Sequence, residues 1–362
     1  MTLVATLSPY SCPIMLGDIL LSGARAPGAE VTLPTIGNVR LVDESVADLN
    51  HVAWLAPKIC RITPNLAVGW SGDYAAAKRI IANMRAYSWP NQFSLECIQE
   101  FLTTTDYDDQ ASIGMAGIFA TEKTFGEFGL NTPSVDLPLF NKSRVLGNGR
   151  ERFIDMCRDV SDITVQGDAS DWVLSVTTTL GFTTALIGEE INNYGGLKTG
   201  FGGFFEIMLF NGNEFCKLDD VLYCFWSVPS HNEDGIEISP YTTFIKVKYE
   251  NDILIIRRVE FDNRRIGHED IMLIPPMAQI KTMNDLDMIQ KPLLTSTHNC
   301  HYVAVRNDDE YDILPVVQMF ARDSRVRFDE EDHRLSFYCH NDLLSYISDR
   351  VIGRFYRSRS DP

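Results

Sequence analysis

The first eighteen residues constrain the fold most, because they contain two apolar runs joined by a short turn. Thr2–Leu7 is β-branched and apolar with no helical period, and Cys12–Leu16 is apolar again before Asp18. Between them, 8–11 reads Ser-Pro-Tyr-Ser, which is typical of a turn. Consecutive apolar positions indicate strands buried on both faces. The sequence therefore predicts a buried hairpin that returns Asp18 toward Thr2.

Thr2 is a candidate nucleophile. A small residue after Met1 allows the initiator methionine to be removed, which would leave a free amine on a threonine. Such a residue carries both a nucleophilic hydroxyl and its own base. The unperturbed pKa of the amine, about 8, suits that role. Asp18 could hold a cation beside it.

A second informative stretch begins at Lys58, after a long connecting segment that contains Gly, Ala and Pro. Ile59–Ile62 and Leu66–Trp70 read as two strands around a Thr-Pro-Asn turn. Asp73 is a good N-cap, and Asp73–Tyr87 has apolar residues at helical spacing. Ser94–Thr103 is predicted as the next helix.

Composition excludes several classes of protein. The chain has 362 residues, 45% of them hydrophobic, so it can bury a full core and is not globally disordered. Its formal net charge of −17 disfavours a nucleic-acid partner, which needs clustered Lys and Arg. No uncharged run approaches the roughly 18 apolar residues of a membrane span, so no membrane partner is expected.

The eight cysteines are dispersed and form no C-x-x-C pair, which is typical of reduced thiols. The N-terminus lacks the pattern of a signal peptide. We therefore expect a cytoplasmic protein. Histidines and cysteines of the last third match no standard zinc spacing, so we predict no metal site; they are His298, Cys300, His301, Cys339 and His340.

The stretch from Lys58 to Gly72, K-I-C-R-I-T-P-N-L-A-V-G-W-S-G, resembles the N-terminal half of proteasome β-subunits and related N-terminal-nucleophile hydrolases. Thr2 and Asp18 are sixteen residues apart and Lys58 and Gly72 fourteen, as in that family. The resemblance covers roughly residues 2–230 and weakens after 87. It implies an α+β fold, a four-layer αββα sandwich over 1–230, with an additional mixed C-terminal region, 231–362, of unknown role.

The resemblance also implies a role for each matching residue. Thr2 would be the nucleophile, and the ammonium of Lys58 would lower the pKa of its hydroxyl. Asp18 would pair with Lys58. Gly72 would offer its N–H to an oxyanion at the start of a helix, and Trp70 would line the substrate pocket.

The chain departs from the family pattern at several positions. Asn148 stands where the family has a serine that contacts the N-terminal amine, and it is kept as an auxiliary residue. Leu20 replaces an arginine, and the span from Asp18 to Lys58 is longer. The later R-D-x-x-S-G-G motif is not intact before Gly202-Gly203. Three residues could replace its aspartate, with the choice left open: Glu189, Glu190 and Asn192.

These residues favour an enzyme: a threonine amidohydrolase or peptidase acting on peptides or proteins through an acyl-Thr2 intermediate, without a cofactor. The sequence does not choose between hydrolysis and acyl transfer. The alternative is a non-catalytic binding or assembly subunit with a degenerate site, in which residues 231–362 form the interaction module. The resemblance also allows a homo-oligomer.

Overall fold

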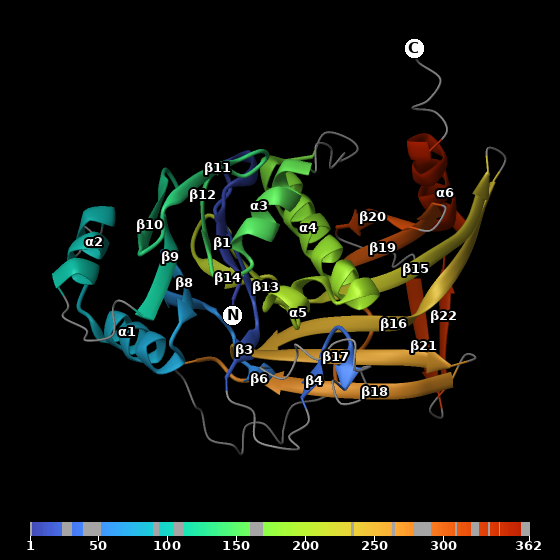
Figure 1. Cartoon of the computed structure of the whole chain (residues 1–362), viewed down its shortest axis with the longest axis horizontal. Helices are drawn as coiled ribbons and strands as arrows, with labels where there is room; N and C mark the ends of the chain where they lie inside the picture. The colour runs from blue at the N-terminus through green and yellow to red at the C-terminus, as the bar shows by residue number, and fades with distance from the viewer. Residues whose placement is uncertain are drawn as a thin grey trace, which may run out of the picture.

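The computed structural model describes residues 2–23, 31–38, 52–89, 94–104, 112–159, 169–232, 235–262, 265–277, 291–307, 310–319, 326–331, 334–339 and 341–355. The N-terminal hairpin lies at the centre of its first sheet (Figure 1), where β1 pairs antiparallel with β2 after a short 3-10 turn, η1. The sheet has the order β11-β12-β1-β2-β13-β14. Its elements are β1 (Val4–Leu7), η1 (Pro9–Ser11), β2 (Ile14–Asp18), β11 (Ser134–Leu137), β12 (Asn141–Leu146), β13 (Phe205–Phe210) and β14 (Phe215–Lys217).

A second sheet, with the order β10-β9-β8-β7, packs face to face on the first. Apolar side chains fill the space between the two sheets, among them Val4, Met15, Ile59 and Ala116. Two helices cover its other face through a separate apolar core. These elements are β7 (Ile59–Thr63), β8 (Leu66–Gly72), β9 (Ile113–Ala120), β10 (Phe125–Leu130), α1 (Tyr74–Ala86) and α2 (Leu95–Thr104).

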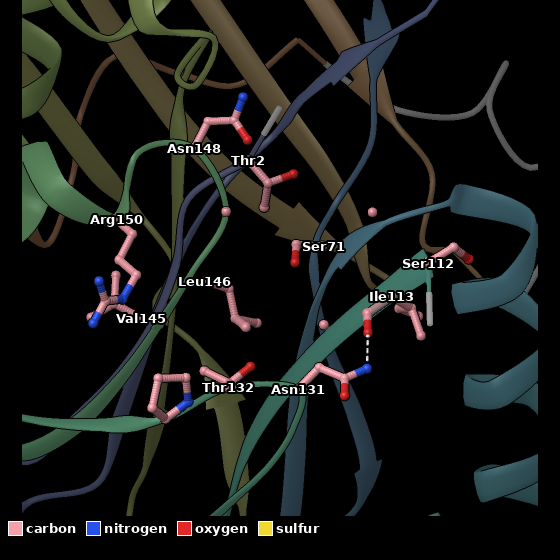
Figure 2. A pocket seen from close by; sticks show the side chains of 14 residues that line it. Thr2, Ser71, Ser112, Ile113, Asn131, Thr132, Val145, Leu146, Asn148 and Arg150 are labelled. Atoms are coloured by element: carbon pink, nitrogen blue, oxygen red, sulfur yellow. Dashed lines mark hydrogen bonds between the residues drawn. The ribbon is translucent and has the colours of Figure 1, made fainter. Parts of the chain in front are cut away.

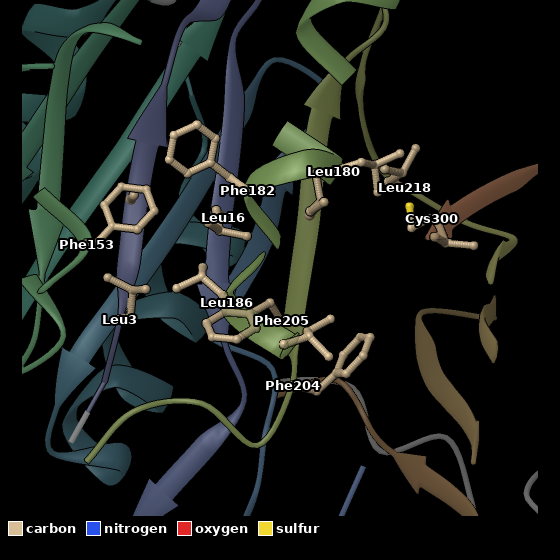
Figure 3. Close-up of a cluster of buried hydrophobic side chains, with 14 of the residues drawn as sticks. Leu3, Leu16, Phe153, Leu180, Phe182, Leu186, Phe204, Phe205, Leu218 and Cys300 are labelled. Carbon is tan, nitrogen blue, oxygen red and sulfur yellow. The ribbon is translucent and has the colours of Figure 1, made fainter. Parts of the chain in front are cut away.

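The opposite face of the first sheet packs against α3 (Arg150–Asp159) and α4 (Asp171–Asn193), which is followed by α5 (Gly195–Thr199). Figure 3 shows Phe153 and Phe182 over the strands that carry Leu3 and Leu16. Most residues from Ser175 to Glu190 are buried, whichever side of α4 they lie on. A helix that is buried on all sides must pack against other elements on every side.

A third sheet packs against the side of α4 that faces away from the first sheet. Its order is β18-β17-β16-β15-β19-β20, and each pair is antiparallel except β15 with β19. One face contributes Tyr223, Ile256 and Tyr302 to the core around α4, and α6 packs on the other face. The strands are β15 (Val221–Asn232), β16 (Gly235–Glu250), β17 (Ile253–Asp262), β18 (Arg265–Ile274), β19 (His298–Asn307) and β20 (Glu310–Gln318), and the helix is α6 (Asn341–Phe355).

Three small two-stranded sheets complete the described chain. One hairpin contains β21 (Val326–Glu331) and β22 (Arg334–Cys339). The segment that connects β2 to β7 forms the other two small sheets. In one, β3 (Leu20–Ser22) pairs with β6 (Val52–Leu55), and in the other, β4 (Thr32–Leu33) pairs with β5 (Gly37–Asn38).

The predicted four-layer αββα sandwich is wrong for this molecule. The described chain is mostly strand, arranged in several antiparallel sheets with six α-helices. The helix α4, expected as an outer layer, lies inside, between the first and third sheets (Figure 1). The resemblance that implied the sandwich weakens after residue 87, whereas the third sheet is built from strands that begin at Val221. Only the broader α+β class is compatible with the structure.

The local predictions near the N-terminus are confirmed. The strands predicted from Ile59 and from Leu66 are β7 and β8, and the two predicted helices are α1 and α2. Asp73 caps α1 by accepting a hydrogen bond from the N–H of Ala76 at 2.7 Å. The proposed boundary at 230/231 falls inside β15, so the last region shares a strand with what precedes it.

Candidate active site

A cavity of about 370 Å³ opens where the ends of the two stacked sheets meet. Thr2 lies on its wall, just before β1, and Ser71 and Gly72 reach it from the end of β8 (Figure 2). The turn from β12 into α3 forms another wall. The lining residues that carry the argument below are Thr2, Ser71, Gly72, Asn131, Asn148 and Arg150.

The backbone around Thr2 is held on both sides. The N–H of Gly149 donates to the carbonyl of Thr2 at 3.1 Å. The next residue, Leu3, donates its N–H to Oδ1 of Asp18 at 2.9 Å and accepts from the N–H of Asp18 at 2.8 Å. Gly147 has φ +85°, and a Cβ there would lie 2.0 Å from the carbonyl oxygen of Thr2. Only glycine at position 147 therefore allows the turn to pack this closely against the backbone of Thr2.

Asp18 and Lys58 form a fully buried ion pair, with Nζ 2.6 Å from Oδ1. The other carboxylate oxygen of Asp18 accepts the N–H of Gly202 at 2.9 Å, and the Lys58 ammonium also donates to the carbonyl of Leu20. Buried charges are tolerated when they are paired and hydrogen-bonded in this way. Asp18 connects this pair to the chain next to Thr2, because it accepts the N–H of Leu3.

Burial dominates the ionisation of both groups. It raises the pKa of Asp18, against the opposing effect of the Lys58 charge. It also lowers the pKa of Lys58, against the opposing charges of Asp18 and Glu206. The ion pair and the hydrogen bonds to both groups oppose this effect of burial and favour the charged forms.

Glu206 on β13 positions Lys58 and was missed by the sequence analysis. Its Oε1 accepts the backbone N–H groups of Lys58 and Ile59 at 2.6 and 2.7 Å. Its Oε2 pairs with the ammonium of Lys217. The signal in the sequence was a single carboxylate inside the apolar run Phe204–Phe210, since such a residue needs buried partners.

Glu190 is the residue that reaches the paired glycines, a choice that the sequence left open. Its Oε1 accepts the N–H of Gly203 at 2.8 Å and the hydroxyl of Thr35. Burial raises its pKa to about 8. The other two candidates are engaged elsewhere: Glu189 pairs with Arg152 at 2.8 Å, and Asn192 donates to the hydroxyl of Tyr302 at 2.7 Å.

Gly72 lines the same cavity as Thr2 and lies immediately before the N-cap of α1. Its φ is +97°, and a Cβ would lie 2.1 Å from the carbonyl oxygen of Ser112. Only glycine fits this conformation and this approach. The position brings the N-terminal, positive end of α1 to the cavity.

Asn148 lines the cavity, but Trp70 does not. The Trp70 side chain is fully buried in the core beneath α1, with its ring 5.8 Å from that of Tyr74. Successive side chains of a strand point to opposite faces, so Ser71 faces the cavity and Trp70 faces the helix. The assignment of Trp70 to the substrate pocket is therefore corrected, and Ser71 takes that place.

Within the described residues, no helix is long and apolar enough to cross a membrane, and no group of His, Cys, Asp and Glu is arranged to hold a metal ion. His340 lies outside the described residues. Comparison of the chain with protein-family models finds no match, and comparison with curated proteins finds none either.

Proposed function

We propose that this protein, once Met1 is removed, is a threonine-nucleophile amidohydrolase that acts on peptide bonds through an acyl-Thr2 intermediate. The observation that supports this best is the position of Thr2 on a cavity, backed by the buried Asp18–Lys58 pair. Met1 itself lies outside the described residues. The chemistry requires its loss, because the amine of Thr2 is otherwise part of a peptide bond.

The reaction proceeds in two balanced steps. The Thr2 hydroxyl oxygen attacks the substrate carbonyl carbon while its proton passes to the Thr2 amine. The tetrahedral intermediate collapses, the C–N bond breaks, and the leaving amine takes that proton. Water then attacks the resulting ester, with the Thr2 amine again as base, and releases a carboxylic acid and free Thr2.

A buried charge and two backbone dipoles support these steps. The Lys58 ammonium, anchored by Asp18, favours loss of the hydroxyl proton. Gly72 and the start of α1 would offer backbone dipoles to the oxyanion. An amine in place of water as the acceptor would give acyl transfer instead of hydrolysis.

We infer a cytoplasmic location for this activity. Seven cysteines whose side chains the structure describes form no disulfide, and four of them are buried: Cys60, Cys157, Cys224 and Cys300. Burial raises the pKa of the Cys60 thiol to about 11 and that of Cys157 to about 12, so these two thiols are inert at neutral pH.

The proposal is tested by turnover of a panel of fluorogenic peptide amides with protein whose N-terminus is Thr2. Thr2→Ala removes the hydroxyl, so activity should fall to background, whereas Thr2→Ser keeps a hydroxyl and should retain part of it. Equal rates for wild type and Thr2→Ala would contradict the proposal. Absence of turnover across the panel, together with no acylation of Thr2, would favour the non-catalytic binding subunit.

A further inference from the structure

Two hydroxyls border the part of the cavity that lies next to Gly114. In the pairing of β8 with β9, Ser71 lies opposite Gly114, and paired residues of antiparallel strands face the same side of a sheet. A Cβ built on Gly114 would lie 2.9 Å from Oγ of Ser71 and 3.7 Å from Oγ1 of Thr132. It would also lie 3.1 Å from Cδ2 of Leu146. We call the space among these four residues, all of which line the same cavity as Thr2, the hydroxyl pocket.

Glycine at position 114 keeps the hydroxyl pocket open. Its φ lies outside the left-handed region, so the backbone does not require glycine there. A side chain would instead enter the space beside Ser71 and Leu146, at distances shorter than an ordinary contact. The missing side chain of Gly114 therefore leaves room for part of a ligand.

The two hydroxyls differ in the hydrogen bonds that they can still make. Ser71 is 9% exposed, and its hydroxyl has no hydrogen-bond partner within the described part of the chain. Buried hydroxyls are normally satisfied, and Figure 2 shows this one directed into the cavity. The hydroxyl of Thr132 donates to the carbonyl of Leu130 at 3.1 Å, so only its lone pairs are left. The hydroxyl pocket therefore offers a free O–H donor at Ser71 and an acceptor at Thr132.

The side chains around the hydroxyl pocket would not compensate a charged ligand. Arg150 is the one ionisable side chain in the described lining of the cavity. Its guanidinium pairs with Glu151, and Figure 2 shows it extending away from Thr2. Burying an ion without a partner costs much more than burying a neutral group that is hydrogen-bonded. The remaining polar side chains of the lining are neutral: Ser112, Asn131 and Asn148.

We propose that the hydroxyl pocket binds a carboxamide side chain, that of glutamine or asparagine, in the substrate residue next to the bond attacked by Thr2. The inference rests on the proposed function for the identity of the attacked bond. The carboxamide C=O would accept from Ser71, and its NH₂ would donate to Thr132. A carboxylate has no donor for Thr132, and an ammonium has no acceptor for Ser71. The cavity volume, about 370 Å³, lies within the range of small-ligand sites.

Calorimetric titration tests the proposal without requiring turnover. The protein is the full chain carrying Thr2→Ala, and the probes are N-acetyl-Ala-Ala-Gln methylamide and its Glu and Met counterparts, which have similar side-chain size. The Gln peptide should bind roughly tenfold more tightly than either of the others, the contribution expected from one or two neutral hydrogen bonds. Equal affinity for the three peptides, including no detectable binding of any, would overturn the proposal.

Variants of the hydroxyl pocket locate the preference. Ser71→Ala and Thr132→Val each remove one hydroxyl with little change in volume, and each should remove most of the preference for Gln. Gly114→Ala adds a methyl group to the pocket and should weaken binding of the Gln peptide. Thr183→Val is the matched control, because Thr183 lies outside the cavity lining, is also buried and donates to a nearby carbonyl, that of Thr179, at 2.8 Å.

The control should leave the preference unchanged. A preference for Gln that survives both hydroxyl variants, full affinity in Gly114→Ala, or an equal loss in Thr183→Val would contradict the proposal. Circular dichroism establishes that each variant is folded, and the comparison of the three peptides does not depend on the pocket variants.

Binding and acylation can fail separately. An electrophile without a carboxamide that acylates Thr2, in a protein that does not prefer the Gln peptide, would leave the proposed function in place and remove this substrate class. A preference that depends on Ser71 and Thr132, in a protein that is never acylated, would remove the catalytic proposal and leave a carboxamide-binding site.

Discussion

At the residue scale, the most demanding feature is the pair of charges that the fold buries completely at Asp18 and Lys58. Such a pair is weak evidence for stability, because the loss of hydration offsets the attraction. It costs much more to remove one partner than to remove both. Hydrogen bonds from the N–H groups of Leu3 and Gly202 to Asp18 maintain the arrangement.

Removing the two charges of this pair should have strongly non-additive effects on the free energy of unfolding. Asp18→Asn and Lys58→Met, each alone, should lower the free energy of unfolding by about 3–5 kcal/mol, because the other charge stays buried. The double variant should lose less than the sum of the two. Urea denaturation measures all three, and additive losses would show that the pair is not coupled.

Glu190 should make stability depend on pH. Its pKa is raised from 4.5 to about 8, so between these values the folded protein keeps a proton that the unfolded chain releases. The contribution of Glu190 to the free energy of unfolding is fully present below about pH 4.5. It is lost as the pH rises from there through 8. Glu190→Gln should abolish this loss, which is roughly 1.4 kcal/mol per pH unit.

Denaturation of the wild type and Glu190→Gln between pH 5 and 8.5 checks this. The difference between the two curves isolates Glu190 from other buried carboxyls such as Glu127, whose pKa burial raises to about 7. Parallel curves would mean that Glu190 is ionised at neutral pH in the folded protein.

At the scale of elements, local signals predicted local structure well. The hairpin of β1 and β2 and the helices α1 and α2 were each marked by a turn, a cap or an apolar period within a few residues. The contacts that complete the site are not local. Glu206 reaches Lys58 across 148 residues, and Glu190 reaches Thr35 across 155. No pattern within a segment encodes such partners.

The junction of β8 and α1 should be intolerant of any side chain. Gly72→Ala combines a positive φ with a Cβ 2.1 Å from a carbonyl oxygen. Gly212→Ala is the matched control, since Gly212 has φ +100° but open space around it. Gly212→Ala should cost about 1–2 kcal/mol for its backbone conformation, and Gly72→Ala should cost more. Equal losses in thermal or urea unfolding would exclude a steric role for Ser112.

At the scale of the whole molecule, the last third is part of the same core as the first. The third sheet covers α4, and the segment after β18 returns to the core beneath α1 through Met277. The sequence did not reveal this, because the parallel pairing of β15 with β19 joins strands more than sixty residues apart. The resemblance covers roughly residues 2–230 and weakens after 87. It therefore reaches β15 but none of the other strands of the third sheet, and it carried no information about their arrangement.

A chain that ends at Asp220 should therefore not fold normally. Removing β15 and everything after it would expose the face of α4 that contacts Tyr302 and the rest of the third sheet. Large exposed apolar faces cause association. We expect aggregation or a dye-binding, non-cooperative state by light scattering and fluorescence. A monomer with a sharp unfolding transition would show that residues 2–220 form an independent domain.

Intact-protein and peptide mass spectrometry after treatment with a peptide epoxyketone, which reacts with an amine and a hydroxyl on the same terminal residue, tests the central claim most directly. The account predicts a protein that has lost Met1 and carries one adduct, located at Thr2 and absent from Thr2→Ala. A protein that retains Met1 when isolated from its own cells, or one that starts at Thr2 and stays unmodified, would contradict it.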